Sequence, residues 1–265
     1  MIAEHPVIMG ILNLTPDSFF DGGCYETVDA AVERAKKMLA EGAEIIDIGG
    51  ESTRPGFTPI DAETEWLRIG DVLKKVSKLG VKISVDTYKP VVAKRALEHG
   101  ATIVNDVYAF EHLDEAISLA KYFGAELVVT HNSRNRLLSR DIIANVREDF
   151  QRAISEANKH NFDTKNLILD VGIGFVGTPV NDIEIISRLG ELTNEFQERV
   201  LIGTSRKSFM KIFGEPTAAE RLPCTLAATM VAYLGGCAIF RVHDVKANLD
   251  VLNFAKAMYG RRYFP

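Results

Sequence analysis

The chain has 265 residues, of which 46% are hydrophobic, and a formal net charge of −5, so it can bury a large core. No cluster of Lys and Arg is long enough to follow a nucleic-acid backbone, and no apolar run approaches the ~18 residues of a membrane span. The N-terminus lacks the apolar region of a signal peptide, and three sparse cysteines fit reduced thiols, so we expect a soluble, cytoplasmic protein.

Short apolar runs recur along the chain and predict buried strands. Most are continuous rather than alternating, as parallel strands covered on both faces are. The eight predicted strands are residues 7–12, 44–48, 82–86, 102–105, 126–130, 167–170, 200–204 and 238–242.

Amphipathic helix patterns separate these runs. Residues 27–40 carry apolar side chains on one face and charged ones on the other, and residues 62–78 show the same pattern. Eight strand–helix units of roughly 33 residues each predict an α/β fold, a single (β/α)8 TIM barrel over residues 1–265. Long loops follow the first two strands, at residues 13–26 and 50–61.

A polar residue follows nearly every predicted strand. In a (β/α)8 barrel the C-terminal ends of the strands meet at one end and carry the catalytic groups. Carboxylates, amides and cations occur together here, which indicates a site for a polar, partly anionic substrate. The residues are Asn13, Glu51, Asp86, Asn105, His131, Asp170, Lys207, Arg241 and His243.

The two long loops carry motifs of their own. The first, NLTPDSFFDGG, contains Asp17 and two phenylalanines, which favours a loop that covers a ligand over an ordinary polar turn. The second, DIGGESTRPG, holds Arg54 on a stiff segment before Pro55, where it could meet an anion, although a surface arginine explains it equally well. Long loops at this end of a barrel are often mobile lids.

Asp86, Asn105 and Asp170 end three different strands. A buried carboxylate needs hydrogen-bond donors or a cation. Two carboxylates and an amide around one pocket suit a flat heterocycle rich in N–H donors. The alternative for each residue is a helix N-cap, which Asp and Asn favour, and Asp86 in particular could cap the helix that follows it.

The last two strands are followed by cations. GTSRKS places Arg206 and Lys207 after the seventh strand, and RVHDV places Arg241 and His243 after the eighth. Residues two apart in an extended segment point the same way, and these loops frequently bind phosphate in such barrels. We therefore expect an anion clamp. For His243 taken alone, the alternative is a structural role. Asp244 could orient its imidazole or cap the last helix.

Taken together and in this order, these motifs closely resemble the dihydropteroate synthase family of folate biosynthesis. The match spans nearly the whole chain through NLTPDSFFDGG, DIGGESTRPG, SVDTYK, NDV, LDxGIGF, GTSRKSF and RVHDV. The resemblance implies the (β/α)8 barrel and a homodimer. It also implies that p-aminobenzoate displaces pyrophosphate from 6-hydroxymethyl-7,8-dihydropterin pyrophosphate, through a pterin-methylene cation, to give 7,8-dihydropteroate.

The resemblance further implies a role for each matching position. The pterin would be held by Asp86, Asn105, Asp170 and Lys207. The pyrophosphate would be held by Asn13, Arg241 and His243, with Asn13 near a Mg²⁺ cofactor. The p-aminobenzoate would be surrounded by Thr53, Arg54, Pro55, Phe175 and Ser208. The residues expected to be catalytic are Asp17, Arg54, Asp86 and Lys207.

The sequence departs from the family pattern at two places. Where the family reads DPGIGFGK, this chain has Val171 for the proline and Val176-Gly177 for the Gly-Lys pair. The family's His-Met after the fifth strand is His131-Asn132 here. The first change adds a side chain near the p-aminobenzoate wall and removes a cation, so it bears on the affinity for p-aminobenzoate and for sulfonamides.

Two other functions are open to a pterin-binding barrel. A methyltetrahydrofolate–corrinoid methyltransferase would need neither the anion clamp nor the two loop motifs. A non-catalytic pterin-binding member would show erosion at the positions expected to hold pyrophosphate and p-aminobenzoate. The chain keeps these motifs, which favours the synthase.

Overall fold

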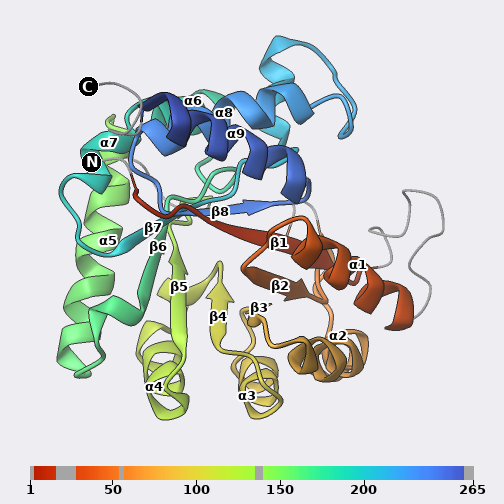
Figure 1. Cartoon of the computed structure of the whole chain (residues 1–265). Coiled ribbons are helices and arrows are strands. Elements are labelled where there is room, and N and C mark those ends of the chain that lie inside the picture. The colour runs from red at the N-terminus through yellow and green to blue at the C-terminus, as the bar shows by residue number, and fades with distance from the viewer. Residues whose placement is uncertain (1–2, 16–27, 54–56, 135–139, 260–265) are drawn as a thin grey trace.

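Eight parallel strands close into a barrel, and helices surround it (Figure 1). The computed structural model describes residues 3–15, 28–53, 57–134 and 140–259. The strands follow one another around the barrel in chain order, and the eighth pairs with the first to close it. The strands are β1 (Val7–Asn13), β2 (Ile45–Gly49), β3 (Lys82–Asp86), β4 (Ile103–Asp106), β5 (Glu126–Thr130), β6 (Leu167–Asp170), β7 (Arg199–Ile202) and β8 (Ile239–Val242).

The predicted barrel is therefore confirmed, and the predicted strand bounds differ from these by no more than about two residues. The α-helices that follow the strands are α1 (Val28–Ala40), α2 (Ala62–Val76), α3 (Pro90–Glu98), α4 (Leu113–Phe123), α5 (Ile142–Lys159), α6 (Pro179–Ser187), α7 (Leu189–Thr193), α8 (Leu222–Leu234) and α9 (Val245–Tyr259). Short 3₁₀ helices are η2 (Ser77–Leu79), η3 (Ala109–Glu111), η4 (Thr164–Asn166) and η5 (Ser208–Phe213).

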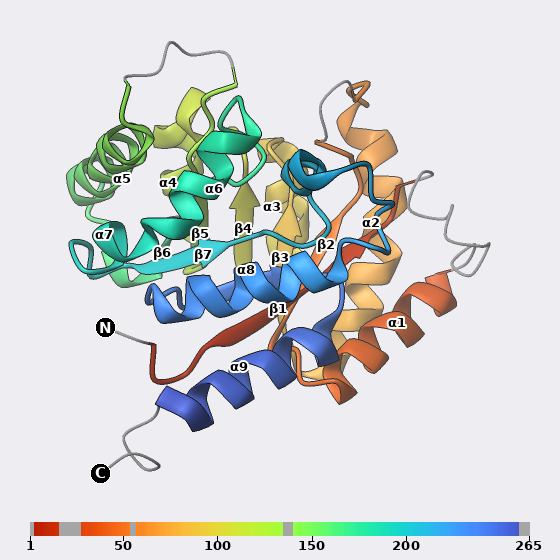
Figure 2. The same cartoon turned by 90° about the horizontal axis from the view of Figure 1, so that it is seen from above.

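The last two helices pack against each other, and α9 also contacts β1, so the end of the chain covers its beginning (Figure 2). Among the described residues, no helix combines the length and the apolar character that crossing a membrane requires.

Each strand buries both of its faces, because successive side chains point to opposite sides of a sheet. Outward side chains such as Ile46, Val85 and Leu127 pack against the helices in the larger core. Inward side chains fill the lower part of the barrel as a separate apolar cluster. Its buried members are Met9, Ile45, Ile103, Val128, Ile168, Leu201 and Ile239.

A polar layer lies above this apolar cluster, toward the C-terminal ends of the strands. Since the side-chain period of a strand is two, the residue two positions after each inward apolar residue also points inward. On four strands that residue is charged or an amide: Asp47, Asn105, Asp170 and Arg241. The barrel thus has an apolar floor and a polar mouth, and the polar mouth is the candidate site.

Candidate active site

Arg241 lies at the centre of the polar layer and joins two carboxylates. Its Nε donates to Asp47 Oδ2 at 2.6 Å, and its Nη2 donates to Asp86 Oδ2 at 2.5 Å. The side chains of Arg241, Asp47 and Asp86 are 17%, 0% and 12% exposed, so this is a largely buried pair of salt bridges. Burial opposes the charge on Arg241, but Asp47 and Asp86 raise its pKa above the ordinary value of arginine.

The neighbouring strands add polar groups that are short of partners. Asn105 donates weakly from Nδ2 to Asp47 Oδ2 at 3.3 Å, and its buried Oδ1 has no hydrogen-bond partner among the described residues. The buried hydroxyls of Ser84 and Thr130 also lack a hydrogen-bond partner within the described part of the chain. Buried polar atoms are normally hydrogen-bonded, so these groups suit a polar ligand that enters the barrel mouth.

Asp170, at the end of β6, shares this chamber with two cations. Its Oδ1 accepts from Gly172 N at 2.9 Å. Burial raises the pKa of Asp170, while the charges of Lys207 and Arg241 oppose that rise. Acidic and basic residues that lie far apart in the sequence therefore act on one another within this polar layer.

Lys207 is the second cation of this chamber. A Cβ built on Gly203 would lie 3.8 Å from Lys207 Nζ and 3.8 Å from Arg241 Cβ, so the two side chains flank the end of β7. Lys207 also donates to the carbonyl of Ile173. Burial lowers the pKa of Lys207 to about 8, although Asp170 acts in the opposite direction.

Asp86 is a second carboxyl group of this layer whose pKa is raised. Burial raises its pKa to about 7, against the lowering effect of Arg241. The interpretation of Asp86 as a helix cap is wrong. Helix α3 begins at Pro90 after Lys89, without any side-chain cap, and Asp86 turns to Arg241 instead.

Of the two cations after β7, Lys207 lies in the polar layer and Arg206 has a different partner. Arg206 donates from Nε and Nη2 to the two carboxylate oxygens of Asp244, at 2.9 and 2.7 Å. Asp244 therefore holds Arg206, and the expectation that it orients the imidazole of His243 is not met. Instead, His243 Nδ1 lies 3.0 Å from Ser205 Oγ, which also accepts from the His243 backbone N–H.

Asn13, at the end of β1, reaches the rim of the polar layer. A Cβ built on Gly49 would lie 3.5 Å from Asn13 Oδ1 and 3.6 Å from Asp86 Oδ2, which places an amide oxygen near a carboxylate oxygen. Mg²⁺ prefers oxygen ligands and is usually held by one or two protein oxygens together with water and substrate phosphates. The donor set at Asn13 fits this ion in its chemistry.

The residues expected around p-aminobenzoate are only partly described. Arg54 and Pro55 lie outside the described residues, and so does Asp17, which was expected to be catalytic. The carbonyl of Thr53 and the ring of Phe175 both contact Arg134, a residue of the loop after β5. Ser208 is exposed at the start of η5, directly after Lys207.

Two strand-end residues, Glu51 and His131, have structural partners among the described residues. Glu51 accepts from the Tyr88 hydroxyl at 3.0 Å and pairs with Lys89, so it ties the loop after β2 to the start of α3. His131 is fully buried, with Nδ1 2.6 Å from Asp149 Oδ2. Both residues are structural partners within the described part of the site.

Two residues of the site, Asp47 and Arg134, were not predicted from the sequence. Asp47 had a recognisable signal, because it is a single charge inside an otherwise apolar strand. Ile45, two residues before it, points into the barrel. Side chains two apart in a strand point the same way, so Asp47 also points into the barrel. Arg134 had no such signal, since it lies in an irregular loop.

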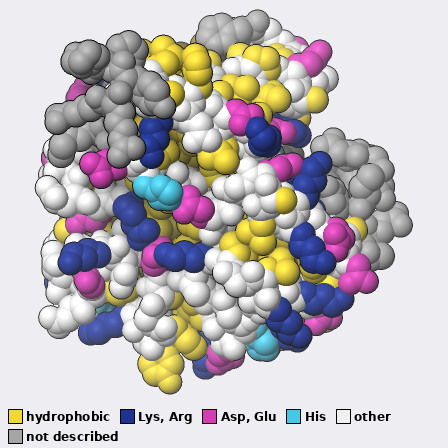
Figure 3. Space-filling view, in the orientation of Figure 1, with side chains coloured by type: hydrophobic (Ala, Val, Ile, Leu, Met, Phe, Trp, Pro, Cys, Tyr) yellow, Lys and Arg dark blue, Asp and Glu magenta, His cyan; other side chains and the backbone are white. Residues whose placement is uncertain are grey.

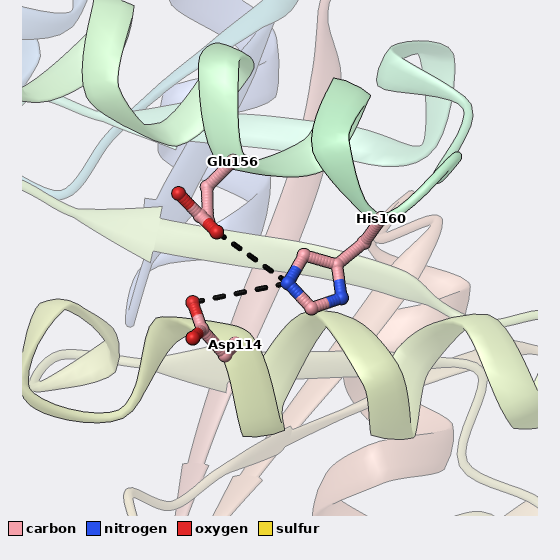
Figure 4. Close-up of side chains that lie close together, drawn as sticks. All are labelled: Asp114, Glu156 and His160. Atoms are coloured by element: carbon pink, nitrogen blue, oxygen red, sulfur yellow. Dashed lines mark ion pairs between the residues drawn. The ribbon is translucent and has the colours of Figure 1, made fainter.

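A further group of ligand-type side chains lies between the outer helices α4 and α5 (Figure 4). His160 Nε2 is 3.4 Å from Glu156 Oε1 and 3.9 Å from Asp114 Oδ1. Lys159 already pairs with the other oxygen of Glu156, at 2.8 Å. These contacts form an interhelical ion-pair network, and we assign no metal to it.

Comparison with known proteins gives one consistent result. A family model described as "Pterin binding enzyme" matches residues 9–243, a span that contains every site residue named above. A dihydropteroate synthase of Bacillus subtilis (strain 168) is 40% identical over 259 residues, which cover 97% of this chain and 90% of that protein.

Solved structures agree with the sequence relatives. A dihydropteroate synthase of Clostridium difficile, crystallised in the presence of pteroic acid, superposes with a TM-score of 0.90 at 38% identity and covers 97% of this chain and 98% of its own. The enzyme of Xanthomonas albilineans with 4-aminobenzoic acid also gives a TM-score of 0.90, at 34% identity, and covers 97% and 94% of the two chains.

Proposed function

The chain belongs to the dihydropteroate synthase family of pterin-binding enzymes, and from this we propose that it joins a dihydropterin to p-aminobenzoate. The substrate is 6-hydroxymethyl-7,8-dihydropterin pyrophosphate. The amine of p-aminobenzoate takes the place of the pyrophosphate, and the products are 7,8-dihydropteroate and pyrophosphate. The protein is therefore a transferase of folate biosynthesis.

The observation that carries this proposal is the mixed charge of the polar layer. Asp86 and Asp170 supply buried acceptors, and Lys207 and Arg241 supply cations in the same cavity. A pterin presents adjacent N–H donors at its edge, which match carboxylate and amide oxygens. A pyrophosphate requires cations. Both halves of the substrate thus find complementary groups in one place.

The pterin half is proposed to lie against Asp86, Asn105 and Asp170. The unpartnered Oδ1 of Asn105 can accept from the ring. As the bond to pyrophosphate breaks, positive charge develops on the methylene group and spreads into the electron-rich pterin. Fixed carboxylates in a water-poor cavity stabilise such a charge more than bulk water does. No side-chain nucleophile is needed for this reaction.

The pyrophosphate half is proposed to lie against Arg241 and His243. Arg241 uses Nε and Nη2 for its two carboxylates, and Nη1 makes no hydrogen bond among the described residues. Three N–H donors, two on Nη1 and one on Nη2, therefore remain for phosphate oxygens. Asp47 and Asp86 hold the guanidinium in place before the substrate arrives, so less ordering is required when it binds.

We also propose that Asn13 holds Mg²⁺ together with the pyrophosphate. The bound ion would neutralise charge on the departing group. The contribution of the chain is the amide oxygen of Asn13, at the rim next to Asp86.

The proposed function is tested by pyrophosphate release. Purified protein, both substrates and Mg²⁺ should give pyrophosphate and dihydropteroate in equal amounts, and a chelator of Mg²⁺ should stop the release. A protein that binds the pterin substrate but releases no pyrophosphate would instead be a non-catalytic pterin-binding member.

Replacing Asp170 by asparagine should weaken pterin binding by about 10- to 150-fold, which corresponds to the ~1.5–3 kcal/mol of a charge-assisted hydrogen bond. One acceptor becomes a donor and then faces the N–H groups of the ring. Calorimetric titration with a pterin that lacks the pyrophosphate measures the loss. Binding of inorganic pyrophosphate serves as the internal control and should change little, and unchanged pterin affinity would contradict the pairing.

A homodimer is a further proposal. An apolar groove lies between α8 and α9, lined by Leu226, Ala227, Met230, Asp250, Val251 and Phe254. Hydrophobic side chains gather over these helices in the upper part of the surface view (Figure 3), and Phe254 is 66% exposed. A second copy on this face would remove that surface from water. Light scattering should give a mass near twice the 29.3 kDa of one chain, and the mass of one chain would exclude the dimer.

A cytoplasmic location is proposed from the cysteines. Cys224 and Cys237 are both free thiols, as is usual for proteins of reducing compartments. Fractionation of cells that make the protein would test this, and recovery outside the cytoplasm would exclude it.

A further inference from the structure

Arg134 connects three of the loops at the mouth of the barrel. From the loop after β5, its Nη1 donates to the carbonyl of Thr53 at 2.8 Å. Its Nη2 donates to the carbonyl of Gly174, in the loop after β6, at 3.0 Å. The guanidinium carbon lies 4.1 Å from the centroid of the Phe175 ring. Arg134 is therefore in contact with both Thr53 and Phe175, two of the residues expected around p-aminobenzoate.

The charge of Arg134 lacks a carboxylate partner within the described part of the chain. Its hydrogen bonds go to two backbone carbonyls and to the Tyr108 side chain, and burial lowers its pKa, while Tyr108 and Asp182 oppose that effect. Asp182 is itself engaged, because its Oδ1 accepts from Gly174 N at 2.6 Å. A partly desolvated cation without a close anion is costly unless a ligand supplies one.

The other cations of the site lie close to carboxylates. Arg206 pairs with Asp244, Arg241 pairs with Asp47 and Asp86, and Lys207 lies in the field of Asp170. The loop after β6 continues as Val176 and Gly177, which carry no charge. Among the residues described, Arg134 and Lys207 are the cations near the Phe175 ring, and of these two only Lys207 has the charge of Asp170 acting on it.

The geometry also matches the shape of the second substrate. Lys207 Nζ lies 5.1 Å from the centroid of the same Phe175 ring, so this ring is near both the proposed pterin side and Arg134. The amine of p-aminobenzoate must face the pterin, and its carboxylate is para to the amine, so it points away. Arg134 presents a planar fork, and N–H donors remain after its contacts with two carbonyls and with Tyr108.

We propose that Arg134 binds the carboxylate of p-aminobenzoate and thereby selects an anionic aromatic amine as the second substrate. This rests on the proposed function. The residue determines specificity through charge, and it also holds the loop after β2 to the loop after β6.

The test compares p-aminobenzoate with p-aminobenzamide, a neutral amine of nearly the same shape. In Arg134→Met, the KM for p-aminobenzoate should rise about 10- to 150-fold, as expected when a charge-assisted hydrogen bond is lost. The KM for p-aminobenzamide and the KM for the pterin substrate should change by less than about threefold, a small fraction of that loss. The wild-type preference for the acid over the amide should therefore nearly disappear.

Arg221→Met is the matched control. Arg221 is also partly buried, and its guanidinium also bonds to backbone carbonyls, those of Pro216 and Arg206. This variant should keep the preference for the acid. Arg134→Lys, which keeps the charge but not the fork, should fall between wild type and Arg134→Met, and it replaces Arg134→Met if that variant does not fold.

Equal losses for the acid and the amide in Arg134→Met would overturn the proposal, because they would show that Arg134 only holds the loops. No loss for either amine would overturn it as well. If the wild-type protein turned over neither amine, the proposed function would fail. Calorimetric titration of the two amines, in the presence of pyrophosphate, would then still decide whether Arg134 selects the acid.

Discussion

Arg241→Ala should lower the free energy of unfolding by about 3–5 kcal/mol, because it removes one partner of a buried ion pair and leaves the carboxylates uncompensated. Asp47 and Asp86 both pair with this guanidinium, and Asp47 is fully buried. Equilibrium unfolding in denaturant measures the loss. Arg206→Ala is the control of similar chemistry, since Arg206 pairs with a single carboxylate that is more exposed. Arg206→Ala should therefore lower the free energy of unfolding by less than Arg241→Ala does.

The same substitution should weaken binding of the pterin pyrophosphate far more than binding of the pterin product. Only the substrate carries the anion that Arg241 is proposed to hold. The double variant Arg241→Ala/Asp47→Asn separates the two effects, because it removes one uncompensated charge. It should recover part of the stability but none of the affinity for pyrophosphate. Equal losses of substrate and product affinity would remove the proposed role of Arg241.

Gly172→Ala should cost at least ~4 kcal/mol of the free energy of unfolding, which is exceptional for a single substitution. A Cβ at this position would lie 1.8 Å from the carbonyl oxygen of His131 and 2.9 Å from its carbonyl carbon. Both atoms belong to the backbone, so no side chain can move aside. The φ of +75° adds strain that only glycine avoids.

Gly177→Ala is the matched control for this prediction. Gly177 lies in the same loop with a φ of +84°, but a Cβ there would meet nothing within 4 Å. Gly177→Ala should lower the free energy of unfolding by only ~1–3 kcal/mol, which is the cost of an unfavourable backbone conformation. Unfolding of both variants in denaturant gives the comparison. If the two substitutions cost the same, the close approach to His131 would not be the cause.

The contact at Gly172 also matters for the site. The backbone N–H of His131 donates to the carbonyl of Asp170 at 2.9 Å, directly before this turn. Displacing Gly172 would therefore move the strand end that positions Asp170. The folded fraction of Gly172→Ala should have a reduced kcat, because catalysis depends on groups held to within a fraction of an ångström.

Most of the strand order and the polar residues at the strand ends could be predicted from the sequence. Buried parallel strands require continuous apolar runs, and the connection rules of a (β/α)8 barrel then bring their C-terminal ends together. Asp86, Asn105 and Asp170 were found in this way. The alternative role of Asp86, as the N-cap of α3, fails because Lys89 is the residue at the N-cap position and α3 has no side-chain cap.

The pairing of the charges could not be predicted in the same way. Arg206 and Lys207 are neighbours in sequence, yet Arg206 turns to Asp244 while Lys207 turns into the cavity. The φ of +58° at Arg206 produces this divergence. A single backbone dihedral in a loop is not encoded in a pattern of residue types.

What the sequence by itself determined is the set of local preferences: continuous apolar runs, amphipathic helices, and polar residues where the strands end. Only the tertiary structure decided which of those polar groups compensate one another. Arg241 and Asp47 are 194 residues apart, and they meet because the closed barrel aims both side chains inward at the same height. Electrostatic interactions depend on distance and burial, and both quantities exist only once the chain has folded.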